Sequence, residues 1–301
     1  MKKNRLGTSD LYVSELALGC MTLGTDERNA KWIIDEALDQ GINYLDTADL
    51  YDQGLNEEIV GKALKGRRDS IILATKVGNH LKEDGSWYWD PSKGYIKEQV
   101  KESLRRLGTD YIDLYQLHGG TIDDPIDDTI EAFEELTKEG VVRYYGISSI
   151  RPNVIRTYVE KSNIVSVMMQ YSLLDRRPEE EILDLLHEHS ISVVARGPMG
   201  KGMLSNDGMS IVQKKGQKGY LDYTYSELAQ IAEQLQNFDQ SVSSLALHYV
   251  LNHPTVASAV FGASSIEQLR ENLAYQEKNI SEENYNQLQQ ITKPITYQQH
   301  R

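Results

Sequence analysis

Short apolar segments rich in Val, Ile, Leu and Tyr alternate eight times along this chain with amphipathic stretches of about 10 to 14 residues. The apolar segments predict strands at 14–19, 43–46, 71–76, 112–118, 142–148, 166–170, 192–196 and 257–262. Helices are predicted after them, for example at 56–64, 95–107, 129–139 and 179–189. Most of these strands are continuously apolar, which is typical of a parallel sheet covered by helices.

Two architectures contain repeated strand-helix units, the closed (β/α)8 TIM barrel and the open doubly wound sheet. No Gly-x-Gly-x-x-Gly follows the first predicted strand, and no Pro-, Gly- or Ser-rich linker divides the chain. We therefore predict an α/β protein in which residues 1–301 form a single barrel domain. Residues 7–10 lie between short apolar pieces and predict an N-terminal β-hairpin that closes the bottom of the barrel.

The charge balance argues against a nucleic-acid partner, because 32 Lys and Arg against 45 Asp and Glu give a net charge of −13. The single cysteine, Cys20, argues against internal disulfides and Cys-based zinc sites and fits a reducing compartment. We find no signal peptide and no apolar stretch near the roughly 18 residues that span a bilayer. We expect a cytoplasmic protein with no membrane, nucleic-acid or obligate protein partner.

Polar residues end several of the predicted strands, at the face where a parallel barrel forms its active site. Asp46, Lys76 and His118 end consecutive strands, and Tyr51 lies five residues after Asp46. The following strands end in Ser148, Ser149, Gln170 and Arg196. If the barrel is correct, these side chains share one face.

Each of the first four residues also has a structural explanation. Asp46 and Lys76 could form only a buried ion pair. His118 could be a hydrogen-bonded structural histidine, and Tyr51 is one of 18 tyrosines in the chain. The coincidence of four groups that can move or stabilise a proton favours a catalytic site over four separate structural roles.

These four groups suit the protonation of an oxygen atom. The ammonium of Lys76 would lower the pKa of Tyr51 from about 10, which makes the phenol a better general acid at neutral pH. Asp46 would keep Lys76 charged, and His118 would donate a hydrogen bond to a substrate carbonyl oxygen.

The electrons must come from a bound group, because the chain has no cysteine pair and no evident metal cluster. The run 187–189 contains two histidines, but adjacent residues of a helix face apart, so we expect no metal site. A nicotinamide could supply hydride. Residues 261–265 open the predicted helix 266–273 and offer a helix N-terminus to its phosphates, although the same turn could be an ordinary helix cap.

The sequence Leu-Asp-Thr-Ala at 45–48 with Tyr51, continued by 56–64, resembles a signature of the aldo-keto reductase family and its NADPH-dependent bacterial members. The resemblance extends over residues 16–272 and assigns the family's catalytic tetrad. Its members here would be Asp46, Tyr51, Lys76 and His118. It implies reduction of a small-molecule aldehyde or ketone by hydride from NADPH and a proton from the tyrosine.

Three further segments resemble coenzyme-binding parts of the family. Residues 146–149 resemble its Gly-(Val/Ile)-Ser-Asn motif, 197–202 its loop over the pyrophosphate, and 262–272 its clamp on the adenosine phosphate. The resemblance implies a coenzyme site made of Met21, Ser148, Gln170, Arg196, Pro198, Met199, Lys201, Gly202, Gly262, Ser264, Gln268, Glu271 and Asn272. Of these, Ser148 and Gln170 would hold the nicotinamide carboxamide.

Three residues depart from the family pattern. Ser149 replaces its usual Asn, and Arg196 stands where an aromatic residue commonly stacks on the nicotinamide, so a planar guanidinium would face the ring. Gln268 stands where relatives often have a basic residue that binds the 2′-phosphate, and Arg270 or Ser264 would have to compensate. We predict NADPH as the coenzyme and keep NADH as the alternative.

Two long connections have open roles. Trp87 and Trp89 in the first would wall a pocket for apolar or aromatic carbonyl compounds, or only pin their loop to the barrel. The second, 197–220, would be a mobile lid over the coenzyme or a disordered surface loop.

Two alternative functions remain. A redox-sensing subunit that retains its coenzyme, like the potassium-channel β subunits, would show slow turnover. A coenzyme-free aldolase or isomerase would use Lys76 as a Schiff base, which its predicted ion pair disfavours.

Overall fold

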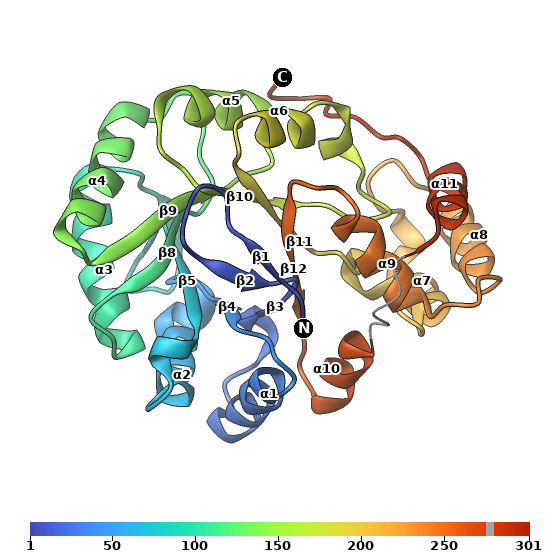
Figure 1. Cartoon of the computed structure of the whole chain (residues 1–301), viewed down its shortest axis with the longest axis horizontal. Coiled ribbons are helices and arrows are strands. Elements are labelled where there is room, and N and C mark those ends of the chain that lie inside the picture. The colour runs from blue at the N-terminus through green and yellow to red at the C-terminus, as the bar shows by residue number, and fades with distance from the viewer. Residues whose placement is uncertain (275–279) are drawn as a thin grey trace.

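The computed structural model describes residues 1–274 and 280–301 and contains a closed barrel of parallel strands (Figure 1). Its strand order is β10-β11-β12-β3-β4-β5-β8-β9, and pairing of β9 with β10 closes the ring. These strands are β3 (Leu16–Gly19), β4 (Tyr44–Asp46), β5 (Ile72–Val77), β8 (Ile112–Leu117), β9 (Val142–Ser148), β10 (Ser166–Gln170), β11 (Ser192–Arg196) and β12 (Val256–Gly262). The predicted TIM barrel is therefore confirmed.

Helices surround the barrel in Figure 1. The helices between or after the barrel strands include α1 (Glu27–Asp39), α2 (Leu55–Ala63), α3 (Lys93–Leu107), α4 (Ile126–Glu139), α5 (Pro152–Lys161), α6 (Ile182–Glu188), α9 (Val242–Leu251) and α10 (Ile266–Leu273). Their ends follow from local chemistry: α3 begins after Ser92, whose side chain accepts a hydrogen bond from Tyr95 N, and ends at Gly108 in the left-handed conformation. The helix predicted at 179–189 is shorter than expected, because Glu181 has a non-helical backbone (φ −161°) that separates α6 from the preceding 3-10 turn.

The apolar core has two layers. The outer layer lies between strands and helices, and α4 contributes Ile126, Ile130 and Phe133 to it at the spacing of one helix face. The inner layer fills the barrel and includes residues of the N-terminal hairpin, so the barrel interior is packed and not a pore. Its buried members are Leu6, Leu11, Val13, Ala17, Tyr44, Ile72, Ala74, Leu114, Val165, Met168, Val194, Ala257 and Val260.

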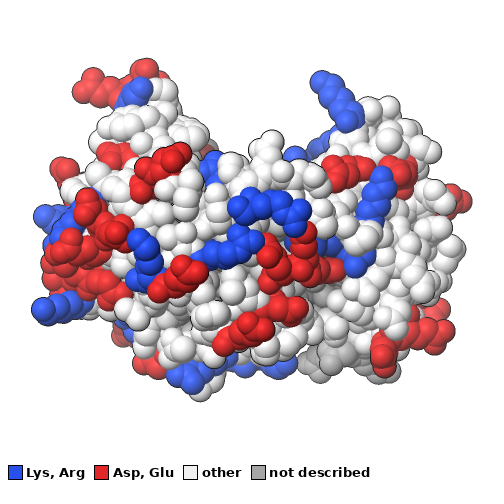
Figure 2. All heavy atoms as spheres, turned by 90° about the horizontal axis from the view of Figure 1, so that it is seen from above, with Lys and Arg blue, Asp and Glu red and all other residues white. Residues whose placement is uncertain are grey.

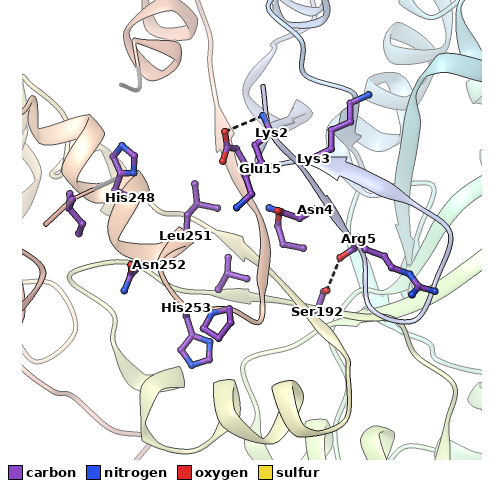
Figure 3. Close-up of a pocket in the computed structure, with 14 residues that line it drawn as sticks. Lys2, Lys3, Asn4, Arg5, Glu15, Ser192, His248, Leu251, Asn252 and His253 are labelled. Carbon is purple, nitrogen blue, oxygen red and sulfur yellow. Dashed lines mark hydrogen bonds between the residues drawn. The ribbon is translucent and has the colours of Figure 1, made fainter. Parts of the chain in front are cut away.

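The predicted N-terminal hairpin is present as β1 (Lys3–Arg5) and β2 (Tyr12–Ser14), which pair antiparallel. It covers the end of the barrel where the strands begin: Asn4 Nδ2 donates to Ala257 O (2.9 Å), and Gly7 N donates to Ser192 Oγ (2.7 Å). A cavity of about 810 Å³ lies beside it, lined in part by Lys2 and His248 (Figure 3).

Two insertions lie at the opposite end, where the strands finish. The first is a hairpin of β6 (Asn79–Leu81) and β7 (Trp87–Trp89) after β5. The second follows β11 and contains α7 (Gly208–Lys215) and then α8 (Tyr225–Leu235). The segment 197–220 is therefore not a loop throughout. Near the C-terminus, α11 (Glu282–Ile291) precedes a tail that reaches α5, where His300 O accepts a hydrogen bond from Asn153 N (2.9 Å).

Charged side chains of both signs lie side by side on the face that carries α5 and α6 (Figure 2). Lys161 of α5 pairs with Asp127 of α4 (2.8 Å), and Arg156 pairs with Glu181.

Among the helices that the structure describes, none is long and apolar enough to cross a membrane.

Candidate active site

The buried side chain of Lys76 lies at the centre of the candidate site. Its Nζ donates to Asp46 Oδ1 (2.5 Å), to the carbonyl oxygen of Thr47 (2.7 Å) and to Tyr51 Oη (3.1 Å). Lys76 is only 1% exposed, so these three partners replace its contact with water. The structure therefore brings three of the four predicted catalytic residues into direct contact.

The strand register explains why these groups meet. Asp46, the last residue of β4, pairs with Ala74 of β5, and Ala74 belongs to the barrel interior. Lys76 lies two residues after Ala74, so its side chain points to the same interior face one step nearer the barrel end. An interior carboxylate and an interior lysine on adjacent strands therefore form the ion pair.

The ion pair holds Lys76 in its charged form. Burial alone favours the neutral amine, but the charges of Asp46 and Tyr51 and their hydrogen bonds outweigh it and hold the pKa of Lys76 above its usual value. Burial also raises the pKa of Asp46, an effect that Lys76 and a hydrogen bond from Gln116 Nε2 (3.1 Å) partly offset. A charged amine with three acceptors is a poor nucleophile, which argues against the Schiff-base alternative.

His118 follows β8 and lies beside the phenol. Its backbone N donates to Val77 O (2.7 Å), and its ring meets the Tyr51 ring edge to face with centroids 5.9 Å apart. Burial, together with the charges of Lys76 and Arg196, lowers the pKa of His118 to about 3, so the imidazole is neutral at neutral pH. Its buried Nδ1 has no hydrogen-bond partner within residues 1–274 and 280–301. A neutral imidazole next to the phenol can donate a hydrogen bond to a carbonyl oxygen.

Tyr51 lies on a tight turn between β4 and α2. Its N donates to Ala48 O (3.2 Å), and the next residues, Asp52 and Gln53, have positive φ angles of 49° and 57°. Gly54 follows with φ 90°. Left-handed backbone is uncommon for residues that carry a side chain, so contacts around the turn must stabilise it.

The polar residues that end β10 and β11 form a second group. Arg196 Nη1 donates to Gln170 Oε1 (3.2 Å), and Gln170 Nε2 donates to Tyr220 Oη (2.8 Å). Lys201 lies over the Tyr220 ring, 5.3 Å from its centroid. Sequence reasoning did not single out Tyr220, although it ends the glycine-rich segment that was expected to fold over the coenzyme. Ser148 ends the adjacent strand β9.

The residues predicted to bind the adenosine phosphate lie in α10 and in the turn just before it. Gln268 Oε1 accepts hydrogen bonds from Ser264 N and Ser264 Oγ (2.9 Å each), and Asn272 Nδ2 donates to Gly262 O (3.4 Å). Glu271 Oε1 accepts a hydrogen bond from Asn206 N (3.3 Å), which connects α10 with the insertion after β11.

Gly262 leaves no room for a side chain, because a Cβ there would lie 2.5 Å from Thr22 Oγ1. The remaining predicted coenzyme residues occupy the turns after β3 and β11, and β12 pairs with both of these strands. They are Met21, Pro198, Met199, Lys201 and Gly202.

Arg270, expected as one of two substitutes for the missing basic residue at 268, pairs with a carboxylate of α1 in this structure. Its Nε pairs with Glu36 Oε1 of α1 (3.0 Å). The start of α10 therefore offers a phosphate the hydroxyl groups of Ser264 and Ser265, the side-chain amide of Gln268 and the helix N-terminus. Together with the amide of Gln170 and the hydroxyl of Ser148 at the ends of β10 and β9, this polar set fits a nicotinamide dinucleotide.

The two tryptophans of the β6–β7 hairpin have different environments. Trp89 packs over the ends of β5 and β8, where a Cβ at Gly78 or Gly119 would lie 2.6 Å or 3.3 Å from its ring. Its Nε1 donates to both carboxylate oxygens of Asp124 (3.0 Å each). Trp87, by contrast, is 53% exposed. Trp89 thus anchors the hairpin to the barrel, and Trp87 is accessible at the mouth.

No group of three or more His, Cys, Asp or Glu residues that could hold a metal ion is found in the described residues.

The model of the Aldo/keto reductase family matches residues 15–293. The chain is similar to the holo form of aldo-keto reductase AKR11C1 from Bacillus halodurans, with 60% identity, a TM-score of 0.95 and coverage of 100% of this chain and 99% of that one. It is 60% identical to the uncharacterized oxidoreductase YqkF of Bacillus subtilis over the full length of both. It is 30% identical to the NADH-specific methylglyoxal reductase of Escherichia coli, over 94% of this chain and 95% of that protein.

Proposed function

Because the chain belongs to the aldo/keto reductase family of oxidoreductases, we propose that it reduces aldehydes or ketones to alcohols, with NADPH as hydride donor and Tyr51 as general acid. The observation that carries this proposal is the contact of 3.1 Å between the buried Lys76 ammonium and the phenol oxygen. A positive charge at that position stabilises the negative charge left on the oxygen when its proton moves to the substrate.

Each residue of the tetrad has a separate task in this proposal. Ser148 and Gln170 would hold the carboxamide of a nicotinamide, which would supply hydride for the carbonyl carbon. His118, as a neutral imidazole, donates a hydrogen bond to the carbonyl oxygen and directs it toward Tyr51. Tyr51 gives its proton to that oxygen, and Lys76 stabilises the phenolate. Asp46 fixes the position of Lys76 and balances its charge.

The choice between NADPH and NADH depends on the start of α10. Support for NADPH comes from the hydroxyl groups of Ser264 and Ser265 at the helix N-terminus, where a 2′-phosphate would be stabilised. Support for NADH comes from Gln268 in place of a basic residue and from Arg270, which pairs with Glu36. A relative at 30% identity is named as NADH-specific. We propose NADPH as the preferred coenzyme. The preference for NADPH over NADH should be smaller than a basic residue at position 268 would give.

The mouth of the barrel favours apolar carbonyl compounds. Large apolar side chains are exposed in four segments at this end: Met21, Trp87, Ile122 and Leu221. These side chains favour binding of an apolar or aromatic substrate, because contact with it removes their apolar surface from water.

The decisive experiment measures oxidation of NADPH and NADH with a panel of aldehydes and ketones of increasing chain length. Tyr51→Phe is the matched control, because it removes only the hydroxyl group. We expect turnover with the wild type and a loss of at least about a hundredfold in Tyr51→Phe, with the coenzyme Kd nearly unchanged. Turnover by Tyr51→Phe equal to that of the wild type would remove Tyr51 from the role of acid.

A further inference from the structure

One face of α3 supports the turn that carries Tyr51. Gln99 Nε2 donates to Asp49 Oδ2 (3.2 Å), two residues before Tyr51. Seven residues later on the same helix, Arg106 Nε donates to Glu57 Oε2 (2.7 Å). Residues seven apart on a helix lie on one face, so α3 holds the Tyr51 segment on both sides of the turn.

The second of these contacts also reaches the strand of Lys76. Glu57 Oε1 accepts a hydrogen bond from Thr75 Oγ1 (2.5 Å), and Thr75 directly precedes Lys76 on β5. The side chain of Arg106 packs against Gly54 at the end of the turn, where a Cβ would lie 2.9 Å from Arg106 Cδ. The same buried polar group therefore contacts the segments of both Tyr51 and Lys76.

We propose that Asp49 is a positioning residue for Tyr51: its buried side chain, held by Gln99, fixes the start of the left-handed turn and thereby the distance from the phenol to Lys76. The role that this gives Asp49 in catalysis rests on the proposed function. Asp49 touches neither Tyr51 Oη nor Lys76 Nζ through its carboxylate, and it acts through the backbone of the turn. Its own N–H donates to Lys76 O (3.4 Å), which adds a direct connection between the two segments.

The surroundings of Asp49 make its protonated form the stable one at neutral pH. Asp49 is fully buried, and burial followed by the nearby charge of Glu57 raises its pKa to about 8, against the opposing charge of Arg106. Tyr95 of α3 and Tyr115 of β8 also face it and are neutral. The guanidinium of Arg106 thus balances the charge of Glu57, and the carboxyl group of Asp49 keeps its proton.

Ionisation of Asp49 would place two negative charges beside one positive charge beneath the turn. Asp49 Oδ1 and Tyr115 Oη have no hydrogen-bond partner in the described chain, so the new charge would lack a protein donor on that side. We expect the turn to loosen, and kcat to fall, as the pH rises through about 8.

Variants at Asp49 and Gln99 test this role. Asp49→Asn keeps the shape and the acceptor for Gln99 but cannot ionise, so its kcat near pH 7 should stay within about twofold of the wild type. The fall of kcat as the pH rises through about 8 should be smaller in it than in the wild type. Asp49→Ala and Gln99→Leu should lower kcat about tenfold or more, since small misplacements of an acid cost that much. The exposed neighbour Glu98 supplies the control Glu98→Ala, which should leave kcat and the pH profile unchanged.

Coenzyme affinity and thermal melting separate positioning from general damage. Asp49→Ala with reduced kcat, an unchanged coenzyme Kd and a cooperative melt supports the proposal. Wild-type kcat and the wild-type pH profile in Asp49→Ala would overturn it, and so would an equal fall above pH 8 in Asp49→Asn.

A readout independent of turnover separates this inference from the proposed function. Crystal structures of the wild type and Asp49→Ala report the distance from Lys76 Nζ to Tyr51 Oη, which should lengthen in the variant. An unchanged distance overturns the positioning role. If the wild type reduces no carbonyl compound, the proposed function fails, and this comparison still decides the role of Asp49 in the turn.

Discussion

Lys76 donates one hydrogen bond to Tyr51 and two to Asp46 and Thr47 at the end of β4, so its charge and its position are both fixed. Lys76→Met removes the ammonium and leaves Asp46 buried without its partner. We expect kcat to fall by at least about a hundredfold and the free energy of unfolding to fall by about 3 kcal/mol. Steady-state kinetics and urea unfolding measure the two effects. Lys65→Met, at an exposed position, should change neither.

The double variant Asp46→Asn/Lys76→Met separates the two effects. It removes the orphaned carboxylate and should recover part of the stability but none of the activity. Recovery of turnover in the double variant would contradict the role of Lys76.

Asp49→Asn has a pH-dependent effect on stability with a definite sign. In the folded protein the pKa of the Asp49 side chain is raised to about 8, whereas the ordinary pKa of an aspartate is 3.8. Between these values folding takes up a proton, so the wild-type free energy of unfolding falls as pH rises, by up to about 1.4 kcal/mol per pH unit. The Asn variant lacks this dependence. Its advantage over the wild type should grow between about pH 4 and 8 and level off above, as measured by urea unfolding at several pH values. A constant difference would contradict the raised pKa.

Gln268→Arg tests the electrostatics of the coenzyme site. A guanidinium at the start of α10 would add a charge-assisted hydrogen bond to a 2′-phosphate but nothing to a 2′-hydroxyl. We expect the ratio of kcat/KM for NADPH over NADH to rise about tenfold, which corresponds to about 1.4 kcal/mol. Arg270→Ala breaks a surface pair with Glu36 and should leave the ratio nearly unchanged. An effect of Arg270→Ala as large as that of Gln268→Arg would mean that Arg270 leaves Glu36 when the coenzyme binds.

Trp89 and Trp87 form a matched pair on one short strand. Trp89→Ala empties the space above Gly78 and Gly119 and should cost about 3 kcal/mol of folding stability. Trp87→Ala should change stability by less than about 0.5 kcal/mol but raise KM for apolar carbonyl compounds more than for short polar ones. Thermal unfolding and KM across the substrate panel measure this. Equal KM values for Trp87→Ala and the wild type would leave Trp87 outside the substrate pocket.

Tyr220 lies at the end of segment 197–220, the expected lid, and accepts a hydrogen bond from Gln170 at the end of β10. This hydrogen bond would hold the lid against the barrel. We expect limited proteolysis to cut segment 197–220 in the free protein and to spare it in the presence of NADPH. Tyr220→Phe should weaken this protection, since it removes the hydroxyl that Gln170 contacts. Equal cutting with and without NADPH would argue against a lid.

The barrel and the Asp46–Lys76–Tyr51 contact were predictable because both follow from short-range patterns. Apolar segments mark the strands, and a polar residue at the end of such a segment must lie at the mouth of the barrel. The ion pair follows from the strand order alone.

Contacts between distant elements were not predictable in the same way. The bond from Gln99 to Asp49 connects a helix surface to a buried turn, and the amphipathic pattern of α3 does not tell which polar residue faces inward. The left-handed backbone at Asp52 and Gln53 could not be predicted, because neither residue is a glycine and only surrounding contacts stabilise this conformation. Helix α7 was missed because glycines and lysines dominate the segment in which it lies.

The last barrel strand in the sequence, β12, pairs with the first, β3, with Ala259 beside Leu16. One neighbour of β3 is therefore among the last parts of the chain to leave the ribosome. Until then the growing sheet carries an unpaired edge, which is prone to pair with other chains. Overproduction at high temperature should for this reason favour inclusion bodies over native enzyme, and slower translation should shift the balance back.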